Sequence, residues 1–229
     1  MDNGVNMLYR WREVRNKSEL ILSRAVGKSG SLEMLYKIFG AAAIVLVLSS
    51  LASVASAASD SRARSDAVVK QAEATIMAAG QKNPLDTQLV NDAIDQLHQA
   101  LKIDPRNDSA YVDLGFCYGL LREASTAEDM YRTATMINPS PGNFKELADI
   151  YLRTGDPDGA LMAANAGLEK DPHDAKLQNA KGIALSDLHR GDEAAQAFRE
   201  AIHYDPSLEV ARQNLEALSR NPAKSGNNQ

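Results

Sequence analysis

This 229-residue chain has four histidines and one cysteine, two residue types that often bind metals or act in catalysis. The histidines are His98, His173, His189 and His203, and their spacing does not match the short intervals at which zinc ligands recur. We interpret them as solvated surface residues. Cys117 stands alone, so no internal disulfide can form, and we expect a buried packing thiol. The sequence therefore predicts no enzyme activity, no metal site and no cofactor.

The charge balance argues against a nucleic-acid partner. From Asp60 onward the chain carries 18 lysines and arginines against 26 acidic residues, a formal charge of −8. A protein that binds phosphate backbones needs a basic patch, and this part of the chain has an excess of acids. The balance is compatible with a protein partner, whether basic or not.

An internal repeat organises the second half of the chain. Three stretches of 29 residues, at 111 to 139, 144 to 172 and 178 to 206, align on their final prolines, which lie 33 and 34 residues apart. One column of this alignment holds only small residues, namely Gly115, Ala148 and Gly182. A period of this length indicates a stack of supersecondary units.

Each unit is expected to be a hairpin of two helices. The small residue lies where the partner helix crosses, and the larger residues at helical spacing beside it fill the space between the helices. The proline follows the second helix, which it cannot continue. We also expect Gly155 and Gly191 to end the first helix of a hairpin, with the next aspartate capping the second.

The column pattern resembles the tetratricopeptide repeat (TPR) family. The resemblance implies an all-α fold, a right-handed solenoid of antiparallel helix pairs, with a surface that binds proteins or peptides without catalysis. Two positions depart from the pattern, Lys181 where Leu is usual and Gly167 where Ala is usual.

The repeats divide the chain from residue 60 onward into a series of segments. A degenerate first repeat is expected to form helices at roughly 63 to 80 and 86 to 102, with a longer loop between them. Three regular repeats follow, then a capping helix, and then a tail expected to be disordered. The segments are 60–107 (degenerate repeat), 108–140, 141–174 and 175–208 (regular repeats), 209–220 (capping helix) and 221–229 (tail).

In arrays of this kind a stripe on each first helix lines a concave groove, which is the expected site for a protein or peptide partner. The candidate groove residues are Val112, Phe116, Lys145, Asp149, Arg153, Lys176, Asn179 and Ile183. Some TPR proteins clamp a C-terminal carboxylate with Lys and Asn, but Val112 and Phe116 occupy those positions in the second repeat. That clamp is therefore not expected.

Two features of the groove lead to expectations about its partner. Lys145, Arg153 and Lys176 would form a basic cluster that orients an acidic group or a carboxylate. Phe116 is either an anchor for an apolar side chain of the partner or a core residue that packs against the neighbouring first helix.

The N-terminal region predicts contact with a membrane. Residues 38–59 carry no charge, and residues 1–37 before them hold seven basic and four acidic side chains. The positive-inside tendency keeps such a leader cytoplasmic and places the repeats across the membrane.

Two interpretations of residues 38–59 remain open. Ala55 and Ala57 fit a signal-peptidase site, with cleavage after Ala57 and a start at Met34, which would make the repeats periplasmic or exported. Alternatively, the segment is retained as a transmembrane anchor in the inner membrane.

The function expected from these patterns is a protein-interaction module of the bacterial cell envelope that acts in the assembly, secretion or biogenesis of an envelope complex. The alternative is a structural scaffold that self-associates into a homo-oligomer. The partner protein is not identified by the sequence.

Overall fold

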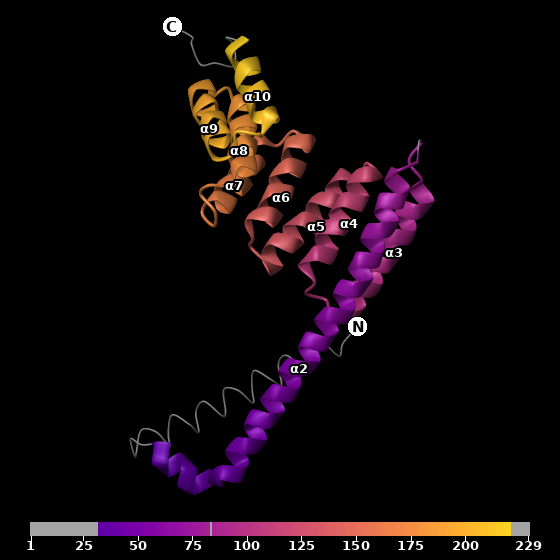
Figure 1. Ribbon diagram of the computed structural model, residues 1–229, viewed down its shortest axis with the longest axis vertical. Helices are drawn as coiled ribbons and strands as arrows, with labels where there is room; N and C mark the ends of the chain where they lie inside the picture. Colours follow the sequence, from indigo (N-terminus) through magenta and orange to yellow (C-terminus); the bar gives the residue numbers. More distant parts are fainter. Residues whose placement is uncertain (1–31, 83, 221–229) are drawn as a thin grey trace. The chain divides into compact units, whose positions relative to one another are not determined.

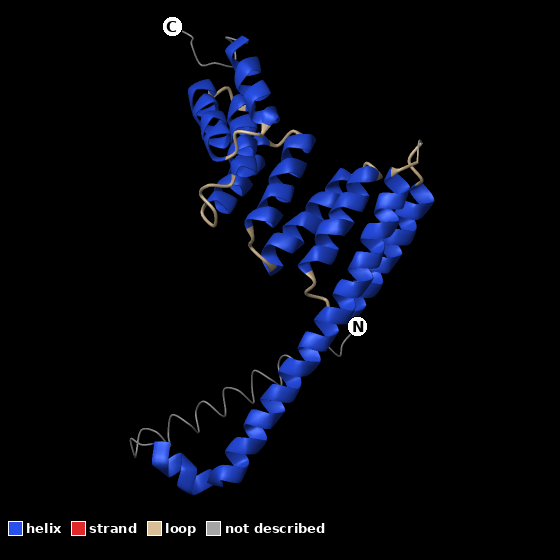
Figure 2. Cartoon of the chain, viewed as in Figure 1, coloured by secondary structure: helices blue, strands red, loops and turns tan. Residues whose placement is uncertain are grey.

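The computed structural model describes residues 32–82 and 84–220, with side chains from residue 53 onward. The regular elements of this part are α-helices, and it contains no strand (Figure 2). In chain order they are α2 (Leu32–Gly80), α3 (Thr87–Ile103), α4 (Asp108–Leu120), α5 (Ala124–Ile137), α6 (Pro141–Thr154), α7 (Pro157–Leu168), α8 (Ala175–Asp187), α9 (Gly191–Tyr204) and α10 (Glu209–Arg220).

The chain divides into two units, residues 1–58 and residues 59–229. In the second unit, α4 pairs with α5, α6 with α7, and α8 with α9, and each hairpin contacts the next (Figure 1). These pairs lie within the ranges 108–140, 141–174 and 175–208. The predicted array of helical hairpins is therefore confirmed.

The core consists of three apolar clusters along the array. The first joins the C-terminal part of α2 to α3 and α4, with Ala72, Leu97 and Leu114 fully buried. The second joins α5, α6, α7 and α8, and the third lies between α8, α9 and α10. Because each cluster uses side chains from adjacent hairpins, no hairpin could bury its apolar face alone.

Close helix crossings explain the column of small residues. A Cβ atom on Gly115 would lie 2.9 Å from the ring of Tyr131, and one on Gly182 would lie 2.5 Å from the ring of Phe198. Ala148 occupies the same place in the middle hairpin and is fully buried. In the first and third regular hairpins an aromatic ring of the second helix therefore packs directly on the backbone of the first, whereas the middle hairpin has Ala164 in place of the ring.

Side-chain caps begin five of the helices. In each case an oxygen of the residue before the helix accepts a hydrogen bond from the first turn, as expected for these residue types. The capping residues are Asp86, Asn107, Ser140, Asp156 and Asp174.

The predicted turn at Gly155 is confirmed, whereas the one at Gly191 is wrong. Gly155 ends α6 in the left-handed conformation, with φ 78°, and Asp156 caps α7. Gly191 is instead the buried first residue of α9, and the left-handed residue of that turn is His189, with φ 59°. Arg122 takes the same conformation, φ 62°, at the corresponding place between α4 and α5. The position in the repeat, rather than the presence of a glycine, therefore decides which residue of this turn adopts the left-handed conformation.

The two ends of the array differ from the regular hairpins. α2 ends at Gly80, where the first helix of the degenerate repeat was expected to end, but it begins at Leu32 rather than near residue 63. At the other end, α10 packs on α9 and α8 through the buried Ala211 and Leu218. The tail 221–229 lies outside the described residues.

Within the part of the chain that the structure describes, no helix has the length and apolar character needed to cross a membrane. Residues 1–31 of the leader and the side chains of residues 32–52 lie outside the described part. The cytoplasmic leader and the signal peptide or anchor at 38–59 therefore stay predictions.

Candidate protein-interaction groove

An open pocket lies along the first helices of the three regular hairpins. Its volume is about 410 Å³. Four of the eight candidate groove residues line it, one from α4, two from α6 and one from α8: Phe116, Asp149, Arg153 and Ile183. Tyr131, Glu146, Ile150 and Leu152 complete the lining. Leu152 belongs to the stripe that the sequence predicts on this first helix. Sequence reasoning missed the other three, although Glu146 and Ile150 lie on the same helix as Asp149. We call this pocket the groove pocket.

Phe116 is the most exposed large apolar side chain in the groove pocket. It is 47% exposed, whereas Ile150 beside it is 1% exposed. The alternative that Phe116 is an ordinary core residue therefore does not hold. Val112, one turn earlier on α4, is half-buried and packs against the second core cluster, so it supports the groove more than it lines it.

Lys145 is not available as a free cation. Its Nζ lies 2.8 Å from Glu146 Oε1 and 2.9 Å from Asp149 Oδ2. Burial disfavours the charged ammonium, but the hydrogen bonds to these two carboxylates outweigh it and raise the pKa of Lys145. One lysine thus faces two acids.

The other two predicted cations lie in different surroundings. Arg153 Nη2 is 3.5 Å from the carbonyl oxygen of Gly119, near the C-terminal end of α4, where a cation is favoured. Lys176 is exposed at the start of α8, and its charge helps, after the hydrogen bonds from Ser207, to lower the pKa of Asp205. The structure therefore does not assemble a free basic cluster, because each cation has neighbours of its own that the column pattern could not reveal.

The C-terminal end of the groove is covered. The amide of Asn214 on α10 donates a hydrogen bond of 3.0 Å to Asn179 Oδ1 on α8. A smaller pocket of about 290 Å³ remains between α8, α9 and α10, lined in part by Ile183, Phe198 and Leu218. The sequence predicted α10 as a cap but not its contact with a groove residue.

A partly buried carboxylate lies one turn before Phe116 on α4. Asp113 Oδ2 is buried and has no hydrogen-bond partner among the described residues. Burial, and then the Glu73 carboxylate of α2, raise the pKa of Asp113 to about 7. No sequence signal distinguished this aspartate from the solvated ones, because its neighbour on α2 belongs to the degenerate repeat.

Burial also makes the Cys117 thiol unreactive. Its side chain is fully buried, and burial together with the Asp113 carboxylate raises the pKa of the thiol to about 12. The predicted packing role of Cys117 is confirmed.

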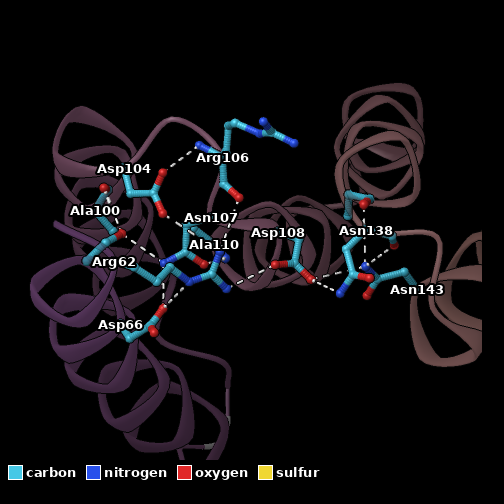
Figure 3. Close-up of polar contacts among 12 residues, drawn as sticks. Arg62, Asp66, Ala100, Asp104, Arg106, Asn107, Asp108, Ala110, Asn138 and Asn143 are labelled. Atoms are coloured by element: carbon cyan, nitrogen blue, oxygen red, sulfur yellow. Dashed lines mark hydrogen bonds and ion pairs between the residues drawn. The ribbon is translucent and has the colours of Figure 1, made fainter. Parts of the chain in front are cut away.

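A polar network fixes α2 to the first regular hairpin (Figure 3). The guanidinium of Arg62 on α2 pairs with Asp66 and Asp108 at 3.0 Å each. Asn107 donates from Nδ2 to Ser65 Oγ and to Asp66 Oδ1 at 2.8 Å each. The network holds the degenerate repeat against the start of α4.

Asp108 extends this network to the next repeat. Its Oδ2 accepts hydrogen bonds from Asn138 Nδ2 at 2.7 Å and from Asn143 Nδ2 at 3.3 Å (Figure 3). Burial alone would raise the pKa of Asp108, but the hydrogen bonds from Asn138, Arg62 and Asn143 lower it. The carboxylate stays charged and joins two inter-repeat loops, which is a structural role.

Among the described residues, no three His, Cys, Asp or Glu side chains lie together in a way that could hold a metal ion. His173 and His203 both contact the ring of Tyr204, at centroid distances of 4.7 and 5.2 Å. The groove pocket is thus the feature of the described residues that best fits a binding function.

Residues 145–209 match the family model for the tetratricopeptide repeat. This part of the chain is therefore similar to tetratricopeptide repeats. Among curated proteins, the chain is similar to a small glutamine-rich TPR-containing protein 2 of Mycosarcoma maydis, with 31% identity over 97 residues, which is 42% of this chain and 28% of that protein. It is also similar to the BBSome complex member BBS4 of Bos taurus, with 25% identity over 115 residues, 50% of this chain and 22% of that protein. The chain thus spans less than a third of these relatives.

Solved structures agree on the TPR fold. The array matches MamA (residues 41 to the end) from Desulfovibrio magneticus RS-1 with a TM-score of 0.58 and 14% identity, covering 72% of this chain and 88% of that one. It matches YrrB, described as a TPR protein with an unusual peptide-binding site, with a TM-score of 0.54 and 19% identity, covering 70% and 78%. At these identities the likeness concerns the fold alone. The TPR fold is generally a non-catalytic scaffold for protein interactions.

Proposed function

We propose that this TPR chain is a non-catalytic protein-interaction module that binds a segment of a partner protein in the groove pocket. The observation that carries the proposal is the 47% exposure of Phe116 inside a pocket whose other apolar residues are partly or fully buried. Large aromatic side chains in concave sites are typical anchors of interfaces.

The proposed setting is the bacterial cell envelope, where the module would take part in assembling or secreting an envelope complex. The uncharged residues 38–59 and the basic leader support this setting. The helix α2 runs from Leu32 to Gly80 and so includes the predicted cleavage position after Ala57. Proteases prefer exposed, non-helical backbone, which supports retention of the segment as an anchor.

Affinity capture tests the binding function. The full chain, solubilised in mild detergent, is used as bait in envelope extract beside Phe116→Ala and the control Met162→Ala, which removes a side chain that is 74% exposed on α7. We expect the same partner with the wild type and the control, and a loss with Phe116→Ala of at least about tenfold, or roughly 1.4 kcal/mol. Equal capture of the partner by all three proteins would show that the groove pocket is not the binding site.

Two further measurements test the setting and the alternative. Intact-mass analysis of protein recovered from whole cells should show an N-terminus upstream of Ala57 if the anchor is retained, and one at Ala58 if it is cleaved. Light scattering of the purified chain should show a monomer, whereas a concentration-dependent oligomer would favour the self-associating scaffold.

A further inference from the structure

We propose that the groove pocket selects a partner segment in which one bulky apolar side chain is flanked by lysine or arginine. This inference rests on the proposed function and names the chemistry of its partner. It differs from the acidic or carboxylate partner that the lysines and arginine of the sequence suggested.

The apolar part of the inference comes from the shape and lining of the groove pocket. Phe116 from α4, Ile150 and Leu152 from α6, and Ile183 from α8 surround it, with the ring of Tyr131 behind them. Its volume of about 410 Å³ lies in the lower part of the range for ligand sites, about 300 to 1,000 Å³. One large side chain, rather than a run of them, fits this space.

The cations of the groove argue against an acidic partner. Lys145 already pairs with Glu146 and Asp149, and Arg153 with the Gly119 carbonyl. A carboxylate of the partner would have to displace one of these contacts and would then face Glu146 and Asp149. Such a like-charge approach is unfavourable.

The acids of the groove argue for a basic partner. Burial raises the pKa of the Tyr131 hydroxyl first, and the Glu146, Asp113 and Asp149 carboxylates raise it further, whereas Arg153 alone lowers it. Two carboxylates (Glu146 and Asp149), one partly charged acid (Asp113) and one guanidinium (Arg153) therefore act on the back of the pocket. Lys145 offsets only part of this negative charge.

Asp113 adds an independent observation. Its Oδ2 is buried without a hydrogen-bond donor, and Glu73 across from it is also acidic. Because Asp113 and Phe116 are three residues apart on α4, they are neighbours on the helix surface. Asp113 does not line the groove pocket, but its charge acts on Tyr131 at the back of the pocket and would favour a cationic group beside Phe116. The charge of −8 from residue 60 onward would also attract a basic segment from a distance.

A library of random dodecapeptides displayed on phage tests the inference without assuming a partner. Selection against the full chain should enrich peptides with a bulky apolar residue next to Lys or Arg. Binding of the enriched peptide should fall at least about tenfold on Phe116→Ala and stay unchanged on Met162→Ala. Replacing the basic residues of the peptide by Glu should lower its affinity by a similar factor. Added salt should weaken the binding of the original peptide.

The outcomes separate the inference from the proposed function. Enriched peptides that are acidic or depend on a free C-terminal carboxylate, but still need Phe116, would overturn the charge preference and leave groove binding intact. Enriched peptides that bind Phe116→Ala as well as they bind the wild type would overturn both. A selection that enriches nothing would also overturn both, because an open interaction groove should accept short segments.

Discussion

Phe116 and Ile183 occupy the same position in the repeat, at the two ends of the groove, yet their side chains differ in exposure. Phe116 on α4 is 47% exposed, although residues of α6 and α8 line the groove pocket beside it. Ile183 on α8 is half-buried and packs against the third core cluster beside α10. The repeat pattern therefore does not decide which groove residues can meet a partner. The capping helix contributes to this difference, because Asn214, Ala217 and Leu218 of α10 lie near Ile183 around the smaller pocket.

The largest predicted difference is between the effects of two Phe→Ala substitutions on stability. Phe198 is 2% exposed and packs on Gly182, so Phe198→Ala should lower the free energy of unfolding by about 3–5 kcal/mol. Phe116→Ala should change it by less than about 0.5 kcal/mol, as exposed substitutions do. Urea denaturation of both variants compares them. A large loss of stability with Phe116→Ala would mean that its ring belongs to the core after all.

The middle hairpin tests whether the small-residue column is a helix crossing. Ala148→Leu should overpack α6 against its neighbours and cost about 1–3 kcal/mol. Gly142→Ala is the matched control on the same helix, because a Cβ at Gly142 would meet nothing within 4 Å. An unchanged urea midpoint for Ala148→Leu would show that the repeat alignment is displaced.

The open end should also be the more sensitive one to pH. The pKa of Asp113 is raised to about 7 from an ordinary 3.8, so the folded state favours the protonated acid. Its contribution to stability is complete below about pH 4 and is lost as the pH rises through 7, by no more than about 2 kcal/mol.

Asp113→Asn should remove this pH dependence and be the more stable protein at pH 8, whereas Asp95→Asn, at an exposed site on α3, should behave like the wild type. Hydrogen exchange should place the change in α2 to α4 rather than in α8 to α10. A wild-type stability that does not fall between pH 5 and 8 would contradict the account of Asp113.

The smallest effect should come from loosening the covered end. Asn214→Ala removes the hydrogen bond to Asn179 and should cost about 0.5–1.5 kcal/mol. It should also speed hydrogen exchange in α10 without changing exchange in α4. If exchange in α10 is unaffected, Leu218 and Ala211 alone hold the capping helix in place.

The repeat pattern predicted those structural features that depend on one residue type at a fixed spacing. Gly115, Ala148 and Gly182 marked the helix crossings, and even the departure at Gly167 has a cause, since a Cβ there would lie 2.7 Å from Leu177 Cδ1. The patterns could not give contacts between columns of different repeats. Charge counting grouped Lys145 with Arg153, whereas the structure pairs Lys145 with acids on its own helix.

The same limit explains the other features that sequence reasoning missed. Gly191 suggested a turn by its type, but the left-handed residue is His189, because the column sets the backbone. Asp113 is affected by Glu73, which belongs to the degenerate repeat. The sequence does not determine how that repeat aligns with α4, so this interaction could not be predicted. The polar network around Arg62 likewise depends on how α2 meets α4 (Figure 3).

Hydrogen exchange of the full chain, with and without a peptide enriched by selection, tests the central claim most directly. We predict slower exchange in α4 and α6 around Phe116 and Asp149, with little change in α7 and α10, which do not line the groove pocket, and no slowing in Phe116→Ala. Protection confined to α5, α7 or α10 in the wild type, and retained in Phe116→Ala, would contradict the claim that the open end of the groove is the binding surface.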